Sequence, residues 1–113
     1  MRGINRVIVS GNVSDSARYH TTGSGAKCAT FKLASDRRGG KPGETITAWV
    51  KINIYSEALV DICSVRLKKG CYVIVEGELM NREGAQGEIT EVRAKEIIFT
   101  DGEHERDVPP STT

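Results

Sequence analysis

Long apolar runs are missing from this sequence of 113 residues. No stretch reaches the roughly 20 consecutive apolar residues that a membrane-spanning helix needs. Arg2, Asn5 and Arg6 interrupt the short apolar stretch at the N-terminus, so we expect no signal peptide. The sequence therefore predicts a cytoplasmic protein without a membrane partner.

Cysteine and histidine are scarce. The three cysteines, Cys28, Cys63 and Cys71, are odd in number, scattered, and never spaced as C-x-x-C. This usage predicts neither a zinc site nor a disulfide framework, and it suits a reducing cytosol. His20 and His104 have no neighbouring ligand residue at metal-binding spacing. We therefore expect surface histidines, no metal and no cofactor.

Catalytic motifs are also absent. The glycine-rich segments GSG (23–25) and GGKPG (39–43) match neither of the common phosphate-binding loops. No nucleophile motif occurs. Glu88, Glu91 and Glu96 alternate with Arg93 and Lys95, which predicts a solvated face rather than an acid–base pair. The chain is therefore not expected to be an enzyme.

The net charge of +1 hides a strong asymmetry. Residues 1–51 contain nine Lys and Arg against three Asp and Glu, whereas residues 52–113 contain seven against twelve. The first part is thus +6 and the second −5. Such a division indicates a polyanionic partner, with ordinary surface variation as the alternative reading.

Alternating apolar residues predict five short strands, at 4–13, 26–35, 46–55, 71–80 and 88–99. The segments between them are a polar loop at 14–25, a glycine-rich break at 36–44 and a hairpin loop at 81–87. Gly11 and Gly77 interrupt strand patterns, as bulges or sharply coiled strands require. The polar, acidic segment 101–113 is predicted to be a flexible tail.

One segment, 56–70, has a helical pattern instead. Leu59, Ile62 and Cys63 follow helical spacing, Ser56 is a candidate N-cap, and Gly70 follows two lysines at the end. Three strands, one helix and two strands form the order of an OB-fold, a five-stranded Greek-key barrel with a helix between strands three and four. A mixed α+β sandwich is the alternative. We expect one all-β domain over 1–100.

The third strand suggests a function. One side is predicted to face the core, and it consists of Ile46, Ala48, Val50, Ile52 and Ile54. The other side is predicted to face outward, and it consists of Thr47, Trp49, Lys51, Asn53 and Tyr55. Exposed rings stack on the bases of single-stranded nucleic acid, Lys51 would meet phosphates, and Asn53 would donate to phosphates or base edges. The alternatives are a Trp49 packed in an oligomer interface or beneath a loop.

Several segments resemble the bacterial and phage single-stranded DNA-binding protein family, in order and at similar spacing over about 3–99. They are INRVIVSGNV, ARY, ATFKLAS, AWVKINIYSEAL, RLKKGCYVIVEGEL and TEV. The resemblance implies an OB-fold that assembles as a homotetramer, or sometimes a dimer. It implies sequence-independent binding of single-stranded DNA in replication, recombination and repair.

The resemblance also implies roles for particular residues. It assigns stacking to Trp49 and Tyr55, and phosphate contacts to Arg6, Lys51 and Arg82, with Arg18 and Lys68 as further candidates. We add the basic residues of the second strand and the loop after it, which are Lys32, Arg37, Arg38 and Lys41. That loop and the 81–87 hairpin lack the aromatic residues that family members often carry there. We therefore expect a small footprint and a steep salt dependence.

The C-terminal DVPPSTT also lacks the acidic, Phe-terminated tip through which the family recruits replication and repair proteins. A primosomal replication protein of the same fold, a dimer that loads helicase, is the nearest rival reading. A protein-protein interaction OB module is the second rival.

Overall fold

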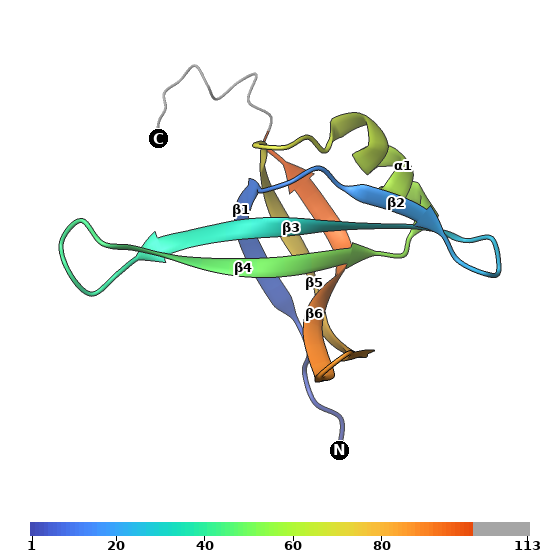
Figure 1. Ribbon diagram of the computed structural model, residues 1–113, viewed down its shortest axis with the longest axis horizontal. Coiled ribbons are helices and arrows are strands. Elements are labelled where there is room, and N and C mark those ends of the chain that lie inside the picture. Colours follow the sequence, from blue (N-terminus) through green and yellow to red (C-terminus); the bar gives the residue numbers. More distant parts are fainter. Residues whose placement is uncertain (101–113) are drawn as a thin grey trace.

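Six strands and one helix make up residues 1–100, the part of the chain that the computed structural model describes (Figure 1). The strands are β1 (Val7–Val13), β2 (Arg18–Thr21), β3 (Lys27–Arg38), β4 (Thr45–Ile54), β5 (Tyr72–Gly84) and β6 (Gly87–Phe99). The helix is α1 (Glu57–Arg66). The predicted tail, 101–113, lies outside the described residues.

The sheet closes on itself. Its strand order is β1–β5–β6–β4–β3, and the end of β1 returns to pair with β3. The β4–β6 step is parallel and joins Ile52 to Val92 and Asn53 to Arg93. These five strands form a barrel, and α1 lies between β4 and β5, the third and fourth barrel strands along the chain. This arrangement confirms the predicted OB-fold. The alternative of an α+β sandwich is wrong.

The short strand β2 was predicted as part of a loop. It pairs antiparallel with β3, from Arg18 opposite Thr30 to Thr21 opposite Lys27. All four of its residues are exposed. A strand held by backbone pairing, with no buried side, has no apolar alternation from which it could be predicted.

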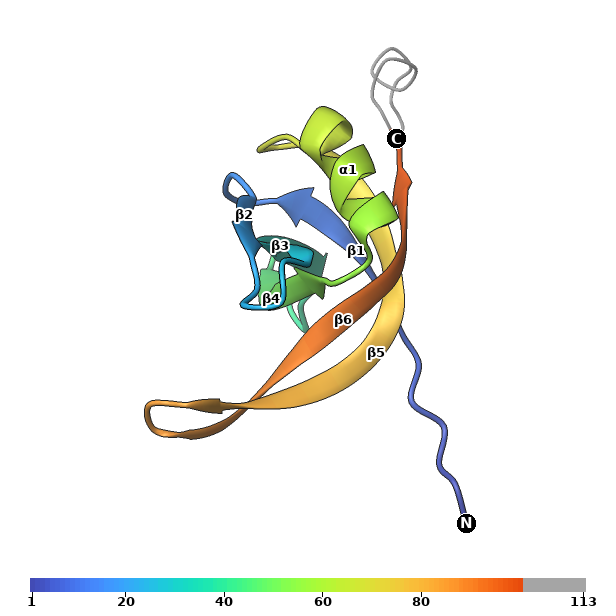
Figure 2. The same ribbon diagram turned by 90° about the vertical axis from the view of Figure 1, so that its right-hand side faces the viewer.

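The core follows the predicted alternation over most of its length. Its fully buried residues come from several strands and from α1: Val13, Leu33, Ile52, Ile54, Cys63, Val73 and Val75. The helix lies over one end of the barrel (Figure 2). Ser56 caps it, since its hydroxyl accepts from the Leu59 N–H at 3.3 Å, as predicted. The buried side runs through Val60 and Cys63, so Ile62, predicted on the apolar stripe, is 47% exposed.

Two hairpins extend beyond the barrel. In the first, β3 continues to Arg38 and β4 begins at Thr45 (Figure 1). The predicted break at 36–44 is therefore shortened to a turn at 39–44. Ile46 and Ala48 lie on this projecting part and are exposed, so their predicted core position is wrong. In the second, β5 and β6 pair up to Gly84 and Gly87, within the predicted 81–87 loop (Figure 2).

Gly11 and Gly77 lie where backbones approach closely. A Cβ on Gly11 would collide with the carbonyl of Ala34, and one on Gly77 with the carbonyl of Arg93. The β5–β6 register also shifts between Glu76 and Gly77, which is the predicted irregularity. Glycine at these two positions lets the strands cross tightly enough to close the barrel.

Candidate nucleic-acid interface

Trp49 lies on β4 and is 62% exposed. Its direct partner on β3 is Ala34, whose side chain is too small to cover an indole. Tyr55, just beyond the end of β4, is 40% exposed. The guanidinium carbon of Arg93 lies 5.2 Å from the Tyr55 ring centre, so a cation–π contact occupies one face of that ring. The predicted exposure of both rings is confirmed.

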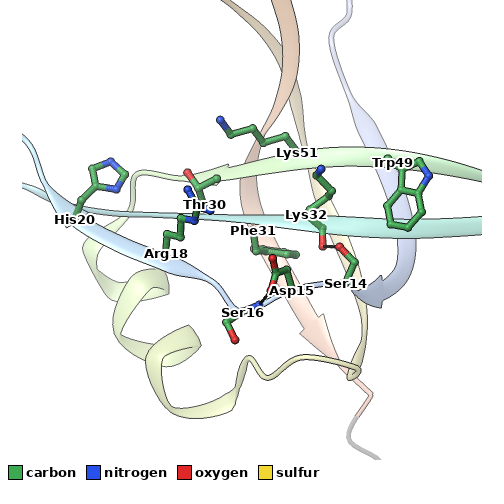
Figure 3. A pocket seen from close by; sticks show the side chains of 10 residues that line it. All are labelled: Ser14, Asp15, Ser16, Arg18, His20, Thr30, Phe31, Lys32, Trp49 and Lys51. Carbon is green, nitrogen blue, oxygen red and sulfur yellow. Dashed lines mark hydrogen bonds between the residues drawn. The ribbon is translucent and has the colours of Figure 1, made fainter.

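A hollow of about 730 Å³ lies beside Trp49 (Figure 3). The segment after β1, then β2, β3 and β4 supply its lining: Ser14, Asp15, Ser16, Arg18, His20, Thr30, Phe31, Lys32, Trp49 and Lys51. Three of these side chains are cationic and one is anionic. Proteins that bind single-stranded nucleic acid combine aromatic rings with a cationic groove in this way.

Two of the cations face each other. Lys32 on β3 and Lys51 on β4 are direct antiparallel partners. Side chains in such positions share one face of the sheet with Cβ atoms about 5 Å apart, and like charges there destabilise the fold. Among residues 1–100, Lys32 forms no ion pair, whereas the Lys51 Nζ lies 3.5 Å from Glu91 Oε2. The pair is therefore a local excess of positive charge that an anion would relieve.

Asn53 does not lie exposed beside the rings as predicted. It is 6% exposed, and its Nδ2 donates to Glu91 Oε1 at 2.6 Å. Its Oδ1 accepts a hydrogen bond from the Thr30 hydroxyl at 3.0 Å. The predicted outward position on an accessible surface is wrong, because neighbouring side chains from β3 and β6 cover the amide.

Glu91 is the centre of this network, although it was predicted to lie on a solvated face. It is only 3% exposed, and Arg82 Nε donates to its Oε2 at 2.8 Å. Burial by itself raises the pKa of Glu91, but hydrogen bonds from Asn53 and Arg82, with the charges of Lys51 and Arg82, outweigh it and hold the pKa below its usual value. The carboxylate is therefore ionised at neutral pH.

Arg6, a predicted phosphate contact, lies on a different wall of the barrel. Just ahead of β1, its Nε bonds to Glu76 Oε2 on β5 at 2.9 Å. The neighbouring Asn5 side chain holds this segment, because it donates to the Leu79 carbonyl and accepts from the Leu79 N–H. Arg6 does not line the hollow beside Trp49.

The other predicted cations are dispersed. Arg37 and Arg38 end β3, and Lys41 lies in the turn of the projecting β3–β4 hairpin. Lys68, after α1, donates from Nζ to the Val65 carbonyl at 3.2 Å. The fold thus gathers Arg18, Lys32 and Lys51 around the hollow, with Arg82 joined to Lys51 through Glu91. It leaves the remaining predicted cations elsewhere.

Sequence reasoning missed the importance of Glu91 and Arg93. Both lie on the outward side of β6, where alternation predicts solvent. Their surroundings depend on the parallel β4–β6 closure, which places Asn53 opposite Arg93 and beside Glu91. No local signal marks such a long-range pairing.

The remaining observations on residues 1–100 concern metal ligands, membrane spans and cysteine reactivity. No group of three or more His, Cys, Asp or Glu in that range is arranged to hold a metal ion. No helix there is long and apolar enough to cross a membrane. Burial raises the pKa of the Cys63 thiol to about 11, with a further contribution from Cys71, so this cysteine stays protonated.

Comparison with known proteins gives a consistent family assignment. The model of the Single-strand binding protein family matches residues 4–103. The Chlorobaculum tepidum "Single-stranded DNA-binding protein 1" is 33% identical over 105 residues, which cover 88% of this chain and 64% of that protein. The Rickettsia typhi "Single-stranded DNA-binding protein" is 32% identical over 101 residues, covering 85% and 66%. This chain therefore spans about two thirds of the length of these curated relatives.

A solved structure agrees with the fold. The structure described as "Plasmodium falciparum SSB complex with ssDNA" superimposes with a TM-score of 0.79 at 28% identity. The match covers 89% of this chain and 98% of that one.

Proposed function

Because the chain belongs to the single-strand binding protein family, we propose that it binds and protects single-stranded DNA, without regard to sequence, in replication, recombination and repair. The observation that carries the proposal is the exposed Trp49 at the edge of a hollow lined by Arg18, Lys32 and Lys51. The names of the relatives and of the solved complex support the same reading.

A DNA strand would use the two chemistries of this face separately. One base stacks on Trp49, which contributes about 1–3 kcal/mol, and a neighbouring phosphate lies between Lys32 and Lys51. Tyr55 serves a different nucleotide, since six residues along a strand span roughly 20 Å. Stacking and phosphate contact read no base edges, so we expect binding that is almost indifferent to sequence.

The remaining cations have secondary roles in this proposal. Arg82 meets a phosphate beside Lys51, and the hairpin residues Arg37, Arg38 and Lys41 attract the strand through charge. Asn53 acts from behind the surface rather than by contact. Arg6 and Lys68 stay predictions, with less support because each is bonded away from the hollow.

Fluorescence of Trp49 tests the proposal directly, since it is the sole tryptophan of the chain. Adding oligo-dT at low salt should quench its emission, and oligo-dA and mixed-sequence strands should do so at similar concentrations. Raising the salt should restore the emission of a partly saturated sample, because bound phosphates release counterions. Unchanged emission at saturating oligo-dT and low salt would show that the ring does not stack.

We further propose that the protein forms a homo-oligomer through the outer face of β1, β5 and β6. The strand register places Ile8, Tyr72 and Ile98 on this face, with exposed fractions of 62%, 45% and 49%. Apolar side chains gathered on one sheet face are typical of a protein interface. A second copy would cover them, in a tetramer or a dimer, and light scattering of the free protein measures which.

A non-enzymatic binding role in the cytoplasm completes the proposal. In the rival reading of a protein-interaction module, the Trp49 face is a protein contact, and oligo-dT would leave its emission unchanged. The primosomal reading gains support from the hairpin 39–44, which has charge but no aromatic residue. A dimer that binds DNA weakly would favour it over the DNA-coating reading.

A further inference from the structure

Glu91 is an anion in the middle of a surface proposed to bind a polyanion. Its charge by itself opposes DNA binding, because a carboxylate repels the phosphates that approach it. The carboxylate is nonetheless buried and held by several partners. The side chain is 2% exposed and its two oxygens accept hydrogen bonds from Asn53 and Arg82. A buried carboxylate with this many partners has a structural purpose on this face.

The carboxylate holds two cations that remain accessible. Arg82 Nε and Lys51 Nζ lie 2.8 Å and 3.5 Å from the same oxygen, Oε2. The side chains of Arg82 and Lys51 are still 41% and 39% exposed. Arg82 uses Nε for this contact and donates from Nη1 to the Glu83 carbonyl at 3.4 Å, which leaves Nη2 for other acceptors. Lys51 keeps two of its three N–H donors.

A chain of hydrogen bonds fixes the carboxylate itself. Asn53 Nδ2 donates to Oε1 of Glu91, and the side-chain oxygen of Asn53, Oδ1, accepts in turn from the Thr30 hydroxyl. The network thereby crosses from β3 through β4 to β6, at the parallel step where the barrel closes. It then reaches Arg82 on β5, so four strands determine where the two cations lie.

We propose that Glu91 is a positioning residue for DNA binding. It holds Arg82 and Lys51 side by side, so that these two side chains are already ordered when they meet the phosphates of a single strand. The inference rests on the proposed function and deepens it. Without the carboxylate the two cations would repel each other, and two long, flexible side chains would have to be ordered when DNA binds. The gain from preorganisation outweighs the repulsion between one buried carboxylate and the DNA.

Glu91→Gln separates positioning from simple charge. The amide keeps the shape and still accepts from Asn53, but it presents an N–H₂ group to Arg82 and carries no charge. We expect affinity for labelled oligo-dT to fall about five- to tenfold, although the protein becomes more positive. Glu88→Gln is the matched control, since it makes the same charge change at an exposed site on β6. It should leave affinity unchanged or slightly raise it.

A double-mutant cycle with Arg82→Ala gives a readout that a merely structural role would not move. If Glu91 acts by holding Arg82, the loss from Arg82→Ala should be much smaller in the Glu91→Gln background than in the natural protein. Thermal melts confirm that each variant is folded. If Glu91→Gln does not fold, Glu91→Asp replaces it, since it keeps the charge but withdraws the carboxylate from Arg82.

The outcomes are distinct. Tighter binding by Glu91→Gln would show that Glu91 only repels DNA, and losses that simply multiply in the cycle would show that it does not act through Arg82. Either result overturns the inference while leaving the proposed function intact. Failure of the natural protein to bind oligo-dT would overturn both.

Discussion

Lys32 and Lys51 are direct partners across β3 and β4, two like charges on one face of an antiparallel pair. Glu91 lies beside Lys51 at 3.5 Å, whereas Lys32 forms no ion pair among residues 1–100. A folded protein tolerates such an arrangement at a cost in stability. We infer that the two lysines form an anion site, and that their repulsion lowers stability while no anion is bound. A change that relieves the repulsion should therefore stabilise the free protein and weaken binding.

Lys32→Ala should stabilise the free protein and weaken DNA binding. Removing one lysine relieves repulsion across the strand pair, which is worth about 0.2–1 kcal/mol in the free energy of unfolding. The same change removes a phosphate contact, so the log–log salt dependence of oligo-dT binding should become shallower by about 0.7. Urea denaturation measures the first effect and titrations at several salt concentrations measure the second.

Lys69→Ala is the matched control for that variant. Lys69 is an exposed lysine after α1 and does not line the hollow. Its removal should leave the salt slope and the stability nearly unchanged. Equal changes of slope in both variants would mean that overall charge, and not the Lys32–Lys51 pair, attracts the strand.

Trp49→Ala should reduce oligo-dT affinity by about 1–3 kcal/mol, the contribution of one stacked base. Trp49→Phe should retain part of it, because a smaller ring still stacks. Tyr55→Ala should cost less than Trp49→Ala, since Arg93 already occupies one face of the Tyr55 ring. Anisotropy of a labelled oligonucleotide measures all three variants.

Tyr19→Ala controls for the loss of any exposed aromatic ring. Tyr19 is 44% exposed on β2, but it is not among the residues that line the hollow. Its removal should leave affinity unchanged. A loss as large as that of Trp49→Ala would shift the proposed stacking surface away from β4.

Gly77→Ala should destabilise the fold by about 3 kcal/mol. Its Cβ would collide with the backbone carbonyl of Arg93, and backbone moves less readily than a side chain. Gly40→Ala is the control, because nothing lies within 4 Å of the added atom and the turn is open. Urea unfolding compares the two, and similar stabilities would contradict the close β5–β6 approach.

Glu91 should make stability depend on pH. Its pKa is lowered in the folded state, so the ionised form is favoured by folding. That contribution is fully present above the ordinary pKa of 4.5 and is lost as the pH falls through the lowered folded-state value. The stability difference between the natural protein and Glu91→Gln should therefore be largest near neutral pH and should shrink on acidification. A difference independent of pH would show that the carboxylate is not held ionised by its partners.

Much of the barrel was predictable because its signals are local. Alternation identified Ile52 and Ile54 as core residues, and Ser56 marked the start of α1. Where a strand leaves the barrel, alternation still continues, so Ile46 and Ala48 were predicted to be buried when they are exposed. Alternation reports which side of a strand is apolar, but it does not report whether another layer lies against that side.

The residues of the candidate site were likewise only partly predictable from the sequence. The outward positions of Trp49 and Lys51 follow from the two-residue period of one strand. The burial of Asn53 and Glu91 follows from which strand lies beside which.

The sequence by itself thus determined the order of the five barrel strands and the helix, the core side of β4 within the barrel, and the presence of an aromatic and basic face. Only the tertiary structure decided that Lys32 faces Lys51, that Arg6 lies on another wall, and that a buried carboxylate joins Arg82 to Lys51. The physical reason is range. Periodicity and capping act between residues close in the chain, whereas burial and ion pairing depend on residues that closure of the barrel brings together.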